Sequence, residues 1–556
     1  MTTAAATRSA ATPASSDEGD GTWWRDAVVY QVYIRSFADG DGDGLGDIAG
    51  IRARLGYLRD LGVDALWINP WYPSPMADAG YDVADYRGVD PAFGTEEEAS
   101  ALVREAHDLG LRIILDIVPN HTSEQHAWFQ AAVAAGPGSP ERARYHFRPG
   151  VADAPPNDWR SVFGGPAWTR LPDGEWYLHL FDSAQPDLNW DHPQVRGEFE
   201  SILRFWFDRG VDGFRIDVAH ALDKDPELPD VGGEEEAMLA AAGGAGHPFW
   251  DRDGVHEIYR AWRRVADSYA EPKVFVAEAW VASPQRLARY LRPDELHTAF
   301  NFDYLGAPWD PAALRAVIDA SVTTMQAADA PATWVLSNHD VVRHVSRLGR
   351  PPASGHSLND LPPHSTLDLE LGRRRARAAA LLMFALPGGA YVYQGDELGL
   401  WEVEDLPAAA RQDPAWRRSG GAEIGRDGCR VPLPWSGTAA PFGFSPDGAT
   451  GVPWLPQPAD FAGVTAQAQD GDPGSMLTLY RAALALRRDT PQLGDGAMEW
   501  LPAEPGVLAF SRGEGFTCVV NLSDAPTVLP AGRVLLATEQ LDTLLPVDAA
   551  VWLGPT

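Results

Sequence analysis

The sequence predicts an α/β protein: a (β/α)8 barrel with a small domain inserted after the third strand and a C-terminal β-sandwich domain. Three observations carry this prediction. Short apolar runs alternate with amphipathic stretches, which is typical of a parallel sheet covered by helices. There are eight such runs, the number that closes a barrel. From about residue 491 the helical pattern gives way to short β-like runs alone.

Each apolar run is short enough for a buried strand, and the stretches between several of them have helical periodicity. The plausible helices include Glu96–Leu109, Pro193–Arg209 and Arg373–Leu386. The predicted strands are Ala27–Phe37, Ala65–Asn69, Arg112–Val118, Gly213–Val218, Lys273–Ala277, Thr298–Phe302, Thr333–Ser337 and Ala390–Tyr393.

Two intervals are too long for simple connections. Residues 122–186, between the third and fourth strands, are rich in Pro, Gly, Trp and Asp and predict an inserted domain. Residues 399–475 form a long excursion after the eighth strand, which we expect to overhang the catalytic face. The predicted organisation is a disordered tail at 1–21, a barrel at 22–121 and 187–490, an inserted domain at 122–186, and a C-terminal β-sandwich at 491–556.

Composition excludes several classes of partner. The net charge of −33 argues against nucleic acid and anionic membranes, which both attract clustered Lys and Arg, and is compatible with a neutral small-molecule substrate. The two cysteines, Cys429 and Cys518, form no disulfide framework or zinc set. The first 21 residues lack the apolar core of a signal peptide, and no run of about 18 apolar residues could span a membrane. We therefore expect a cytoplasmic protein.

Polar side chains follow the C-terminal ends of the predicted strands. The motif DIVPNH (Asp116–His121) follows strand three, GFRIDVAH ends strand four with Arg215 and Asp217, and Glu278 ends strand five within AEAW. The motif SNHD, ending at Asp340, follows strand seven. Each acid alone could be a cap or half of a salt bridge. Together they predict an active site, because this face of a barrel gathers side chains from different strands.

These motifs, in this order, resemble the α-amylase superfamily, glycoside hydrolase family 13. The resemblance extends from about Thr22 to the end of the chain. QPDLNW (Gln185–Trp190) resembles the element that marks the oligo-1,6-glucosidase and α-glucosidase branch, and AGYDVADY (Ala79–Tyr86) is a further match. The resemblance implies a retaining α-glucosidase that releases glucose from the non-reducing end of maltose and short α-glucosides, with some transglucosylation.

The same resemblance implies roles for individual residues. Asp217 is the nucleophile, Glu278 the acid/base, and Asp340 binds the 2- and 3-hydroxyls of the sugar. Around this triad, Arg215 pairs with Asp217, His121 and His339 hydrogen-bond the sugar, and Tyr81 stacks beneath its ring. Asp78 pairs with Arg430 and closes the pocket behind the non-reducing end, which would make the enzyme exo-acting.

Physical chemistry supports the two catalytic roles. Retaining hydrolysis needs two carboxyl groups about 5–5.5 Å apart, one ionised and one protonated. Arg215 and Asp217 point to the same side of one strand, because strand side chains alternate, and a nearby guanidinium lowers an Asp pKa. Trp280 follows Glu278 by two residues and supplies the less polar setting that raises an acid's pKa.

The motif DGDGDGLGD predicts a metal site. Oxygen ligands at alternate positions of a Gly-rich loop are the chemistry of a calcium loop, although an acidic loop of this kind can also be merely solvated. The resemblance favours structural Ca²⁺, with Mg²⁺ as the alternative. The ligands would be the side chains of Asp39, Asp41, Asp43 and Asp47 and the carbonyl of Leu45.

Substrate linkage stays open. Val218, after the nucleophile, resembles the residue found in enzymes that accept α-1,6 bonds. The following Ala219 and His220 resemble actinobacterial α-glucosidases acting on maltose, so α-1,4 cleavage is expected and α-1,6 remains an alternative. Glucosyl transfer of the sucrose isomerase, amylosucrase or trehalose synthase type is a rival that uses the same triad. A non-catalytic relative of the amino-acid transporter heavy-chain type is disfavoured, because both catalytic acids are present.

Overall fold

The computed structural model describes residues 21–232, 246–351, 358 and 365–555. The tail predicted for residues 1–21 lies outside the described residues, apart from Gly21.

Eight parallel strands form the central sheet, in the order β10-β11-β1-β2-β3-β7-β8-β9. The outermost strands meet where the Thr333 hydroxyl of β10 donates to the Ala299 carbonyl of β9, so the sheet curves back on itself as the predicted barrel. The strands are β1 (Val28–Val32), β2 (Ala65–Ile68), β3 (Arg112–Ile117), β7 (Gly213–Ile216), β8 (Val274–Ala277), β9 (Thr298–Ala299), β10 (Thr333–Val335) and β11 (Gly389–Tyr393).

The first strand is shorter than the predicted Ala27–Phe37. It ends at Val32 because the next residues leave the sheet in a 3₁₀ turn, Ile34–Ser36. All of these residues are buried, so burial alone did not distinguish strand from turn. The turn directs the chain into the acidic loop at residues 39–47.

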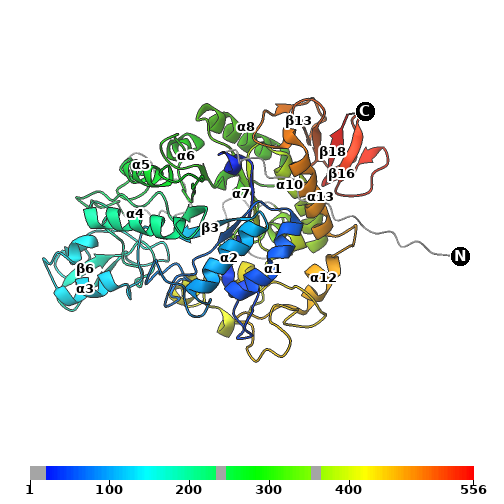
Figure 1. Cartoon of the computed structure of the whole chain (residues 1–556). Coiled ribbons are helices and arrows are strands. Elements are labelled where there is room, and N and C mark those ends of the chain that lie inside the picture. Colours follow the sequence, from blue (N-terminus) through cyan, green and yellow to red (C-terminus); the bar gives the residue numbers. More distant parts are fainter. Residues whose placement is uncertain (1–20, 233–245, 352–357, 359–364, 556) are drawn as a thin grey trace.

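Helices surround the barrel, and side-chain caps define where many of them begin (Figure 1). Asp47 caps the first helix by accepting from the Gly50 amide, and Thr95 with Glu98 forms a capping box on the second. The helices outside the insertion are α1 (Ile48–Leu61), α2 (Glu96–Asp108), α4 (Pro193–Phe207), α5 (Val255–Ala266), α6 (Pro284–Tyr290), α7 (Phe302–Gly306), α8 (Pro311–Ala327), α9 (His344–Leu348), α10 (Leu369–Ala385), α11 (Pro414–Arg418), α12 (Ala466–Gln469) and α13 (Met476–Asp489).

The segment between β3 and β7 folds into a small unit of its own, drawn in cyan in Figure 1. It contains α3 (Ala127–Ala135) and an antiparallel sheet in the order β4-β6-β5. An antiparallel bridge between His121 and Asp187 joins its two ends, which keeps the insertion beside the barrel face. The strands are β4 (Phe147–Pro149), β5 (Trp168–Arg170) and β6 (Glu175–Leu178).

The excursion after β11 contacts this insertion. Arg418, on α11, donates to the Gly164 carbonyl at 2.6 Å and to Asp182 at 3.3 Å. Two segments that are far apart in the sequence therefore meet on one side of the barrel mouth.

The C-terminal residues form a five-stranded antiparallel sheet, β12-β13-β14-β18-β16, and a two-stranded sheet of β15 and β17. One face packs on the barrel, where the Trp552 indole donates to the Leu381 carbonyl of α10 at 3.0 Å. Val519 and Val551 on the other face pack with Leu545 of β17. The strands are β12 (Glu499–Trp500), β13 (Val507–Ser511), β14 (Thr517–Asn521), β15 (Thr527–Val528), β16 (Arg533–Ala537), β17 (Leu544–Leu545) and β18 (Ala549–Gly554).

Candidate active site

The predicted catalytic acids converge at the C-terminal face of the barrel. Asp217 directly follows β7 and Glu278 directly follows β8, and both are more than nine-tenths buried. Asp340 lies in the segment between β10 and α9. β7 and β8 are neighbouring parallel strands, and β10 meets β9 where the barrel closes. The C-terminal ends of these strands share one face, so the barrel itself brings the side chains together.

Arg215 binds three carboxylates at once. Its Nη1 donates to Asp217 Oδ1 at 2.6 Å and to Asp116 Oδ1 at 2.8 Å, and its Nη2 donates to Glu278 Oε2 at 2.7 Å. Asp116 and Arg215 are register partners on adjacent strands, β3 and β7. The Arg215–Asp217 pair was predicted from the sequence. Asp116 was assigned no role, although its place in DIVPNH on a buried strand was a signal.

Burial dominates the electrostatics of this cluster. It raises the pKa of Asp217 well above its usual value, Arg215 opposes the rise, and Glu278 and Asp116 add to it. Burial likewise raises the pKa of Asp116 to about 6 against the opposing effect of Arg215. Arg215 lowers the pKa of Asp217, as expected from the sequence, but burial and the two other acids outweigh its effect. The cluster as a unit retains a proton more strongly than isolated carboxyl groups do.

Glu278 is fixed by two further donors. The Trp280 indole donates to Oε1 at 3.1 Å and the Val218 amide to Oε2 at 3.1 Å. Val218 has a φ of 48°, an unfavourable conformation for a β-branched residue, which costs about 1–3 kcal/mol and aims its amide at Glu278. Trp280 also stacks on Phe302, with 3.6 Å between ring centroids and a 4° angle between the planes.

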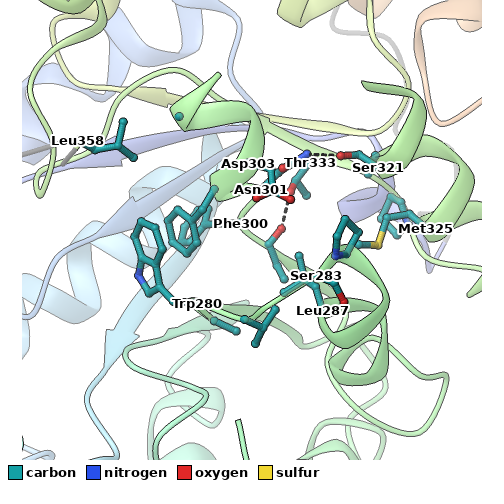
Figure 2. A pocket seen from close by; sticks show the side chains of 18 residues that line it. Trp280, Ser283, Leu287, Phe300, Asn301, Asp303, Ser321, Met325, Thr333 and Leu358 are labelled. Carbon is teal, nitrogen blue, oxygen red and sulfur yellow. Dashed lines mark hydrogen bonds between the residues drawn. The ribbon is translucent and has the colours of Figure 1, made fainter. Parts of the chain in front are cut away.

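Trp280 lines a cavity of about 310 Å³ (Figure 2). The cavity reaches the Ser321 and Met325 side chains of α8, on the side away from Trp280. None of the three catalytic candidates lines it, so Trp280 is its link to Glu278.

Asp340 is held by positive charge. Its Oδ1 accepts from Arg426 at 2.9 Å and from Arg430 at 3.0 Å, and its Oδ2 lies 3.2 Å from His339 Nε2. Burial raises the pKa of Asp340, but His339 and the two arginines outweigh it and hold the pKa well below its usual value. Asp340 is therefore ionised at neutral pH.

Tyr81 connects the two groups of acids. Its ring stacks on His339 at 5.3 Å with a 9° interplanar angle, and its hydroxyl donates to Asp116 Oδ2 at 2.9 Å. Both Tyr81 and His339 are buried, so they form a rigid wall between Asp116 and Asp340.

The predicted pairing of Asp78 with Arg430 is wrong. Asp78 Oδ1 accepts instead from Nη2 of Arg426, at 2.8 Å. Arg430 is 1% exposed and its donors have other partners: Nε donates to the His339 carbonyl at 2.7 Å and Nη2 to Asp340. Arg426 immediately precedes the 3₁₀ turn Asp427–Arg430 and Arg430 ends it. Both lie near Asp413, so the excursion still supplies the cation that faces Asp78.

Gln185 connects His121 with Asp78, a role that was not predicted from the sequence. Gln185, from the QPDLNW motif, places its Nε2 3.3 Å from Asp78 Oδ2 and 3.0 Å from His121 Nε2. Burial lowers the pKa of His121 to about 4, so its ring is neutral at physiological pH. Gln185 and His121 stand at the junction of the insertion and the barrel.

The acidic loop brings three of its carboxylates together. Oxygen atoms of Asp39, Asp41 and Asp43 all lie within 4.8 Å of one another, a donor set that suits a hard divalent cation. Burial raises the pKa of Asp43, as do Asp41 and Asp39, which indicates mutual repulsion that a cation would relieve. Asp47 is used differently: it caps α1 and also accepts from the Gly40 and Asp41 amides. Leu45, the remaining predicted ligand, follows Asp43 and donates its amide to that side chain.

The barrel has eight strands, and buried carboxyl groups lie at the C-terminal ends of these strands. Each of these carboxyl groups is hydrogen-bonded to an arginine. This arrangement is the framework of a glycoside hydrolase. The model of the alpha amylase catalytic domain matches residues 31–496. The chain therefore belongs to the α-amylase family.

Individual relatives span almost the whole chain. It is similar to a probable alpha-glucosidase of Rhizobium meliloti (strain 1021), with 38% identity over 550 residues and 94% of each chain covered. It is also similar to an oligo-1,6-glucosidase of Parageobacillus thermoglucosidasius, with 33% identity, covering 95% of this chain and 96% of that one. The crystal structure of a trehalulose synthase from Pseudomonas mesoacidophila MX-45 aligns with a TM-score of 0.81 and 31% identity, covering 96% and 98%.

Among the residues described, no helix is long and apolar enough to cross a membrane.

Proposed function

We propose that this chain is a retaining, exo-acting α-glucosidase that releases glucose from the non-reducing end of maltose and other short α-glucosides. The observation that carries the proposal is that one guanidinium, Arg215, donates hydrogen bonds to both Asp217 and Glu278. It ties the two carboxyl groups to neighbouring nitrogens of one planar group, which supports the closer spacing of about 5–5.5 Å used by retaining enzymes.

In this mechanism Asp217 attacks the anomeric carbon while Glu278 donates a proton to the leaving oxygen. The glucosyl–Asp217 ester is then hydrolysed by a water molecule that Glu278, now ionised, deprotonates. The raised pKa values of Asp217 and Asp116 support a cluster that keeps one proton before substrate binds. Double displacement requires that proton on Glu278, and binding of the sugar against Asp217 would favour that distribution. Asp340, ionised, would accept hydrogen bonds from two sugar hydroxyls.

Exo action is supported by the group formed by Asp78, Arg426 and Asp413. Arg426 bonds Asp78 at 2.8 Å and Asp413 at 2.6 Å, so charged side chains with fixed geometry stand behind the sugar site. The contact of Arg418 with the insertion supports closure on the same side. A closed end admits a chain terminus and excludes the interior of a long glucan.

The proposal also covers which glucosidic bond is cleaved and whether the glucosyl group passes to water or to another sugar. α-1,4 cleavage is the first expectation, with α-1,6 cleavage and glucosyl transfer as alternatives that the names of the relatives suggest. Product analysis on maltose, isomaltose, sucrose, trehalose and starch tests this. Glucose from maltose in the α-configuration at early times supports the proposal; mixed oligosaccharides released rapidly from starch would contradict it, and isomaltulose from sucrose would favour an isomerase.

A structural Ca²⁺ at Asp39, Asp41 and Asp43 completes the proposal, with Mg²⁺ as the alternative. The side chains would bind the cation, and the Leu45 carbonyl and Asp47 remain further candidates. We also propose a cytoplasmic location, which the two buried free cysteines, Cys429 and Cys518, support because a reducing compartment preserves thiols.

A further inference from the structure

Lys224 is unusual in this chain. Of the 45 Lys and Arg residues only two are lysine, Lys224 and Lys273. Lys224 lies in the loop after β7, seven residues beyond Asp217, and its side chain is 0% exposed. A buried ammonium group is costly unless it is paired and hydrogen-bonded, so its partners explain its presence.

Two side chains partner the ammonium. Its Nζ donates to Asn120 Oδ1 at 2.6 Å and forms an ion pair with Asp187 Oδ2 at 2.9 Å. Asp187 is also 0% exposed, and its Oδ1 accepts from the Leu180 amide at 3.0 Å. The group therefore joins three segments: the loop after β3, the end of the insertion and the loop that carries Asp217.

The chemistry of lysine settles how Asn120 is oriented. An ammonium only donates hydrogen bonds, so the Asn120 atom that faces it must be the carbonyl oxygen. The amide nitrogen then points the other way, 3.2 Å from Asp187 Oδ2 and 3.1 Å from His121 Nδ1. Because that nitrogen only donates, His121 Nδ1 must accept and cannot carry a proton.

The other side of the ring leads to the same tautomer. His121 Nε2 lies 3.1 Å from the Tyr81 carbonyl oxygen, which only accepts. The ring is neutral, so its single proton belongs on Nε2. Gln185 Nε2 also lies 3.0 Å from this atom, so a donor faces each ring nitrogen. The two nitrogens still differ, because Nε2 alone has an acceptor, the Tyr81 carbonyl, within reach. A proton on Nδ1 would instead point at the Asn120 N–H group.

We propose that Lys224, acting through Asn120 and Asp187, is a positioning residue that fixes His121 in the Nε2–H tautomer. The Nε2–H group donates to the Tyr81 carbonyl in this structure, and a sugar hydroxyl would share it when substrate binds. Only the identity of the final acceptor, a sugar hydroxyl, rests on the proposed function. The tautomer itself follows from the geometry around the ring.

The compact ammonium explains why arginine does not serve here. It delivers two bonds from one nitrogen inside a space with no exposed surface, whereas a guanidinium is larger and spreads its donors over a planar fork. The Lys224→Arg variant is therefore expected to disturb the group rather than replace it.

Neutron diffraction on crystals of the unmodified protein exchanged into D₂O tests the tautomer directly. We expect a deuteron on His121 Nε2 and none on Nδ1. A deuteron on Nδ1, or on both nitrogens, overturns the proposal. The result does not depend on activity, so it stands even if the protein fails to cleave α-glucosides.

Kinetics test the consequence. The double variant Lys224→Met/Asp187→Asn removes both charges together, which avoids leaving a lone buried carboxylate. With the orientation of Asn120 released, we expect KM for an aryl α-glucoside to rise about tenfold, the effect of one hydrogen bond, while kcat changes less than about threefold. Neutron density should then show the ring proton shared between the two nitrogens.

Lys273→Met is the matched control. Lys273 donates to the Val211 carbonyl at 2.8 Å and immediately precedes β8, at the opposite end of that strand from Glu278. Its loss should lower the melting temperature and leave KM unchanged. An unchanged KM in a folded double variant, or an equal rise in the control, contradicts a positioning role for Lys224.

Discussion

Arg426 Nη2 lies 2.8 Å from Asp78 Oδ1, although 348 residues separate the two in the sequence. The same guanidinium donates from Nη1 to Asp340 Oδ1 at 2.9 Å and from Nε to Asp413 at 2.6 Å. One side chain thus links the acid expected to bind the 2- and 3-hydroxyls with the acid at the far end of the sugar. Arg426 sets their relative positions.

Replacing Arg426 by Met should therefore impair catalysis more than folding. Asp78, Asp340 and Asp413 would lose a cation that they share. Breaking a buried ion pair costs about 3–5 kcal/mol. We expect kcat/KM on maltose to fall by about 10²–10³-fold. Arg411→Met is the control, because Arg411 lies on the same excursion but donates only to the Glu404 and Ile424 carbonyls. Comparable losses in both variants would show that the excursion, and not the ion pair, matters.

The acid/base role of Glu278 predicts a dependence on the leaving group. Glu278→Gln should lose about 10²–10⁴-fold on maltose, whose leaving hydroxyl needs a proton, and far less on an aryl glucoside with an acidic phenol. Azide should restore turnover by forming a glucosyl azide of retained configuration, measured by NMR of the product. Equal losses on both substrates without azide rescue would assign the proton to another group.

Asp116 predicts a shift in the pH profile. Its charge raises the pKa of Asp217, and it also takes a share of the Arg215 guanidinium. Asp116→Asn removes the negative charge that raises the pKa of Asp217, and it leaves Arg215 paired with two acids instead of three. Both changes lower the pKa of Asp217. Since the nucleophile must be ionised, the acid limb of kcat/KM should move to lower pH. An acid limb that stays in place or moves upward would exclude coupling between the two acids.

The barrel was predictable because its signals are local. Eight buried apolar runs such as Gly213–Ile216 are long enough to be recognised as strands in the sequence. The positions of Asp217 and Glu278 follow from where β7 and β8 end. The same reasoning extended the first strand too far, because the turn at Ile34–Ser36 is as buried as the strand before it.

The pairing of Asp78 was not predictable in the same way. Arg426 and Arg430 stand four residues apart in an excursion with little regular structure, so no periodicity indicates which one faces Asp78. The net rise of the Asp217 pKa was not predictable from the sequence either, because it depends first on burial and then on the other acids that the barrel brings to the same guanidinium. Both features depend on tertiary structure.

The acidic loop supplies a final prediction, in which Asp43 and Asp47 should behave differently. If calcium binds Asp39, Asp41 and Asp43, saturating it at about 100 times its Kd should stabilise the fold by about 2.7 kcal/mol, measured as a calcium-dependent rise in melting temperature. Asp43→Ala should abolish that rise, because it removes one of the metal ligands. The Asp43 side chain makes few other contacts, so little else is lost. Asp47 accepts from the Gly50 amide at 2.6 Å as the cap of α1, so Asp47→Ala should cost about 0.5–2 kcal/mol both with calcium and with chelator. Activity below the transition should change little on chelation, since this loop contributes none of the catalytic acids. A calcium response that survives in Asp43→Ala but vanishes in Asp47→Ala would place the cation around Asp47 and remove the Asp39–Asp43 group as its site.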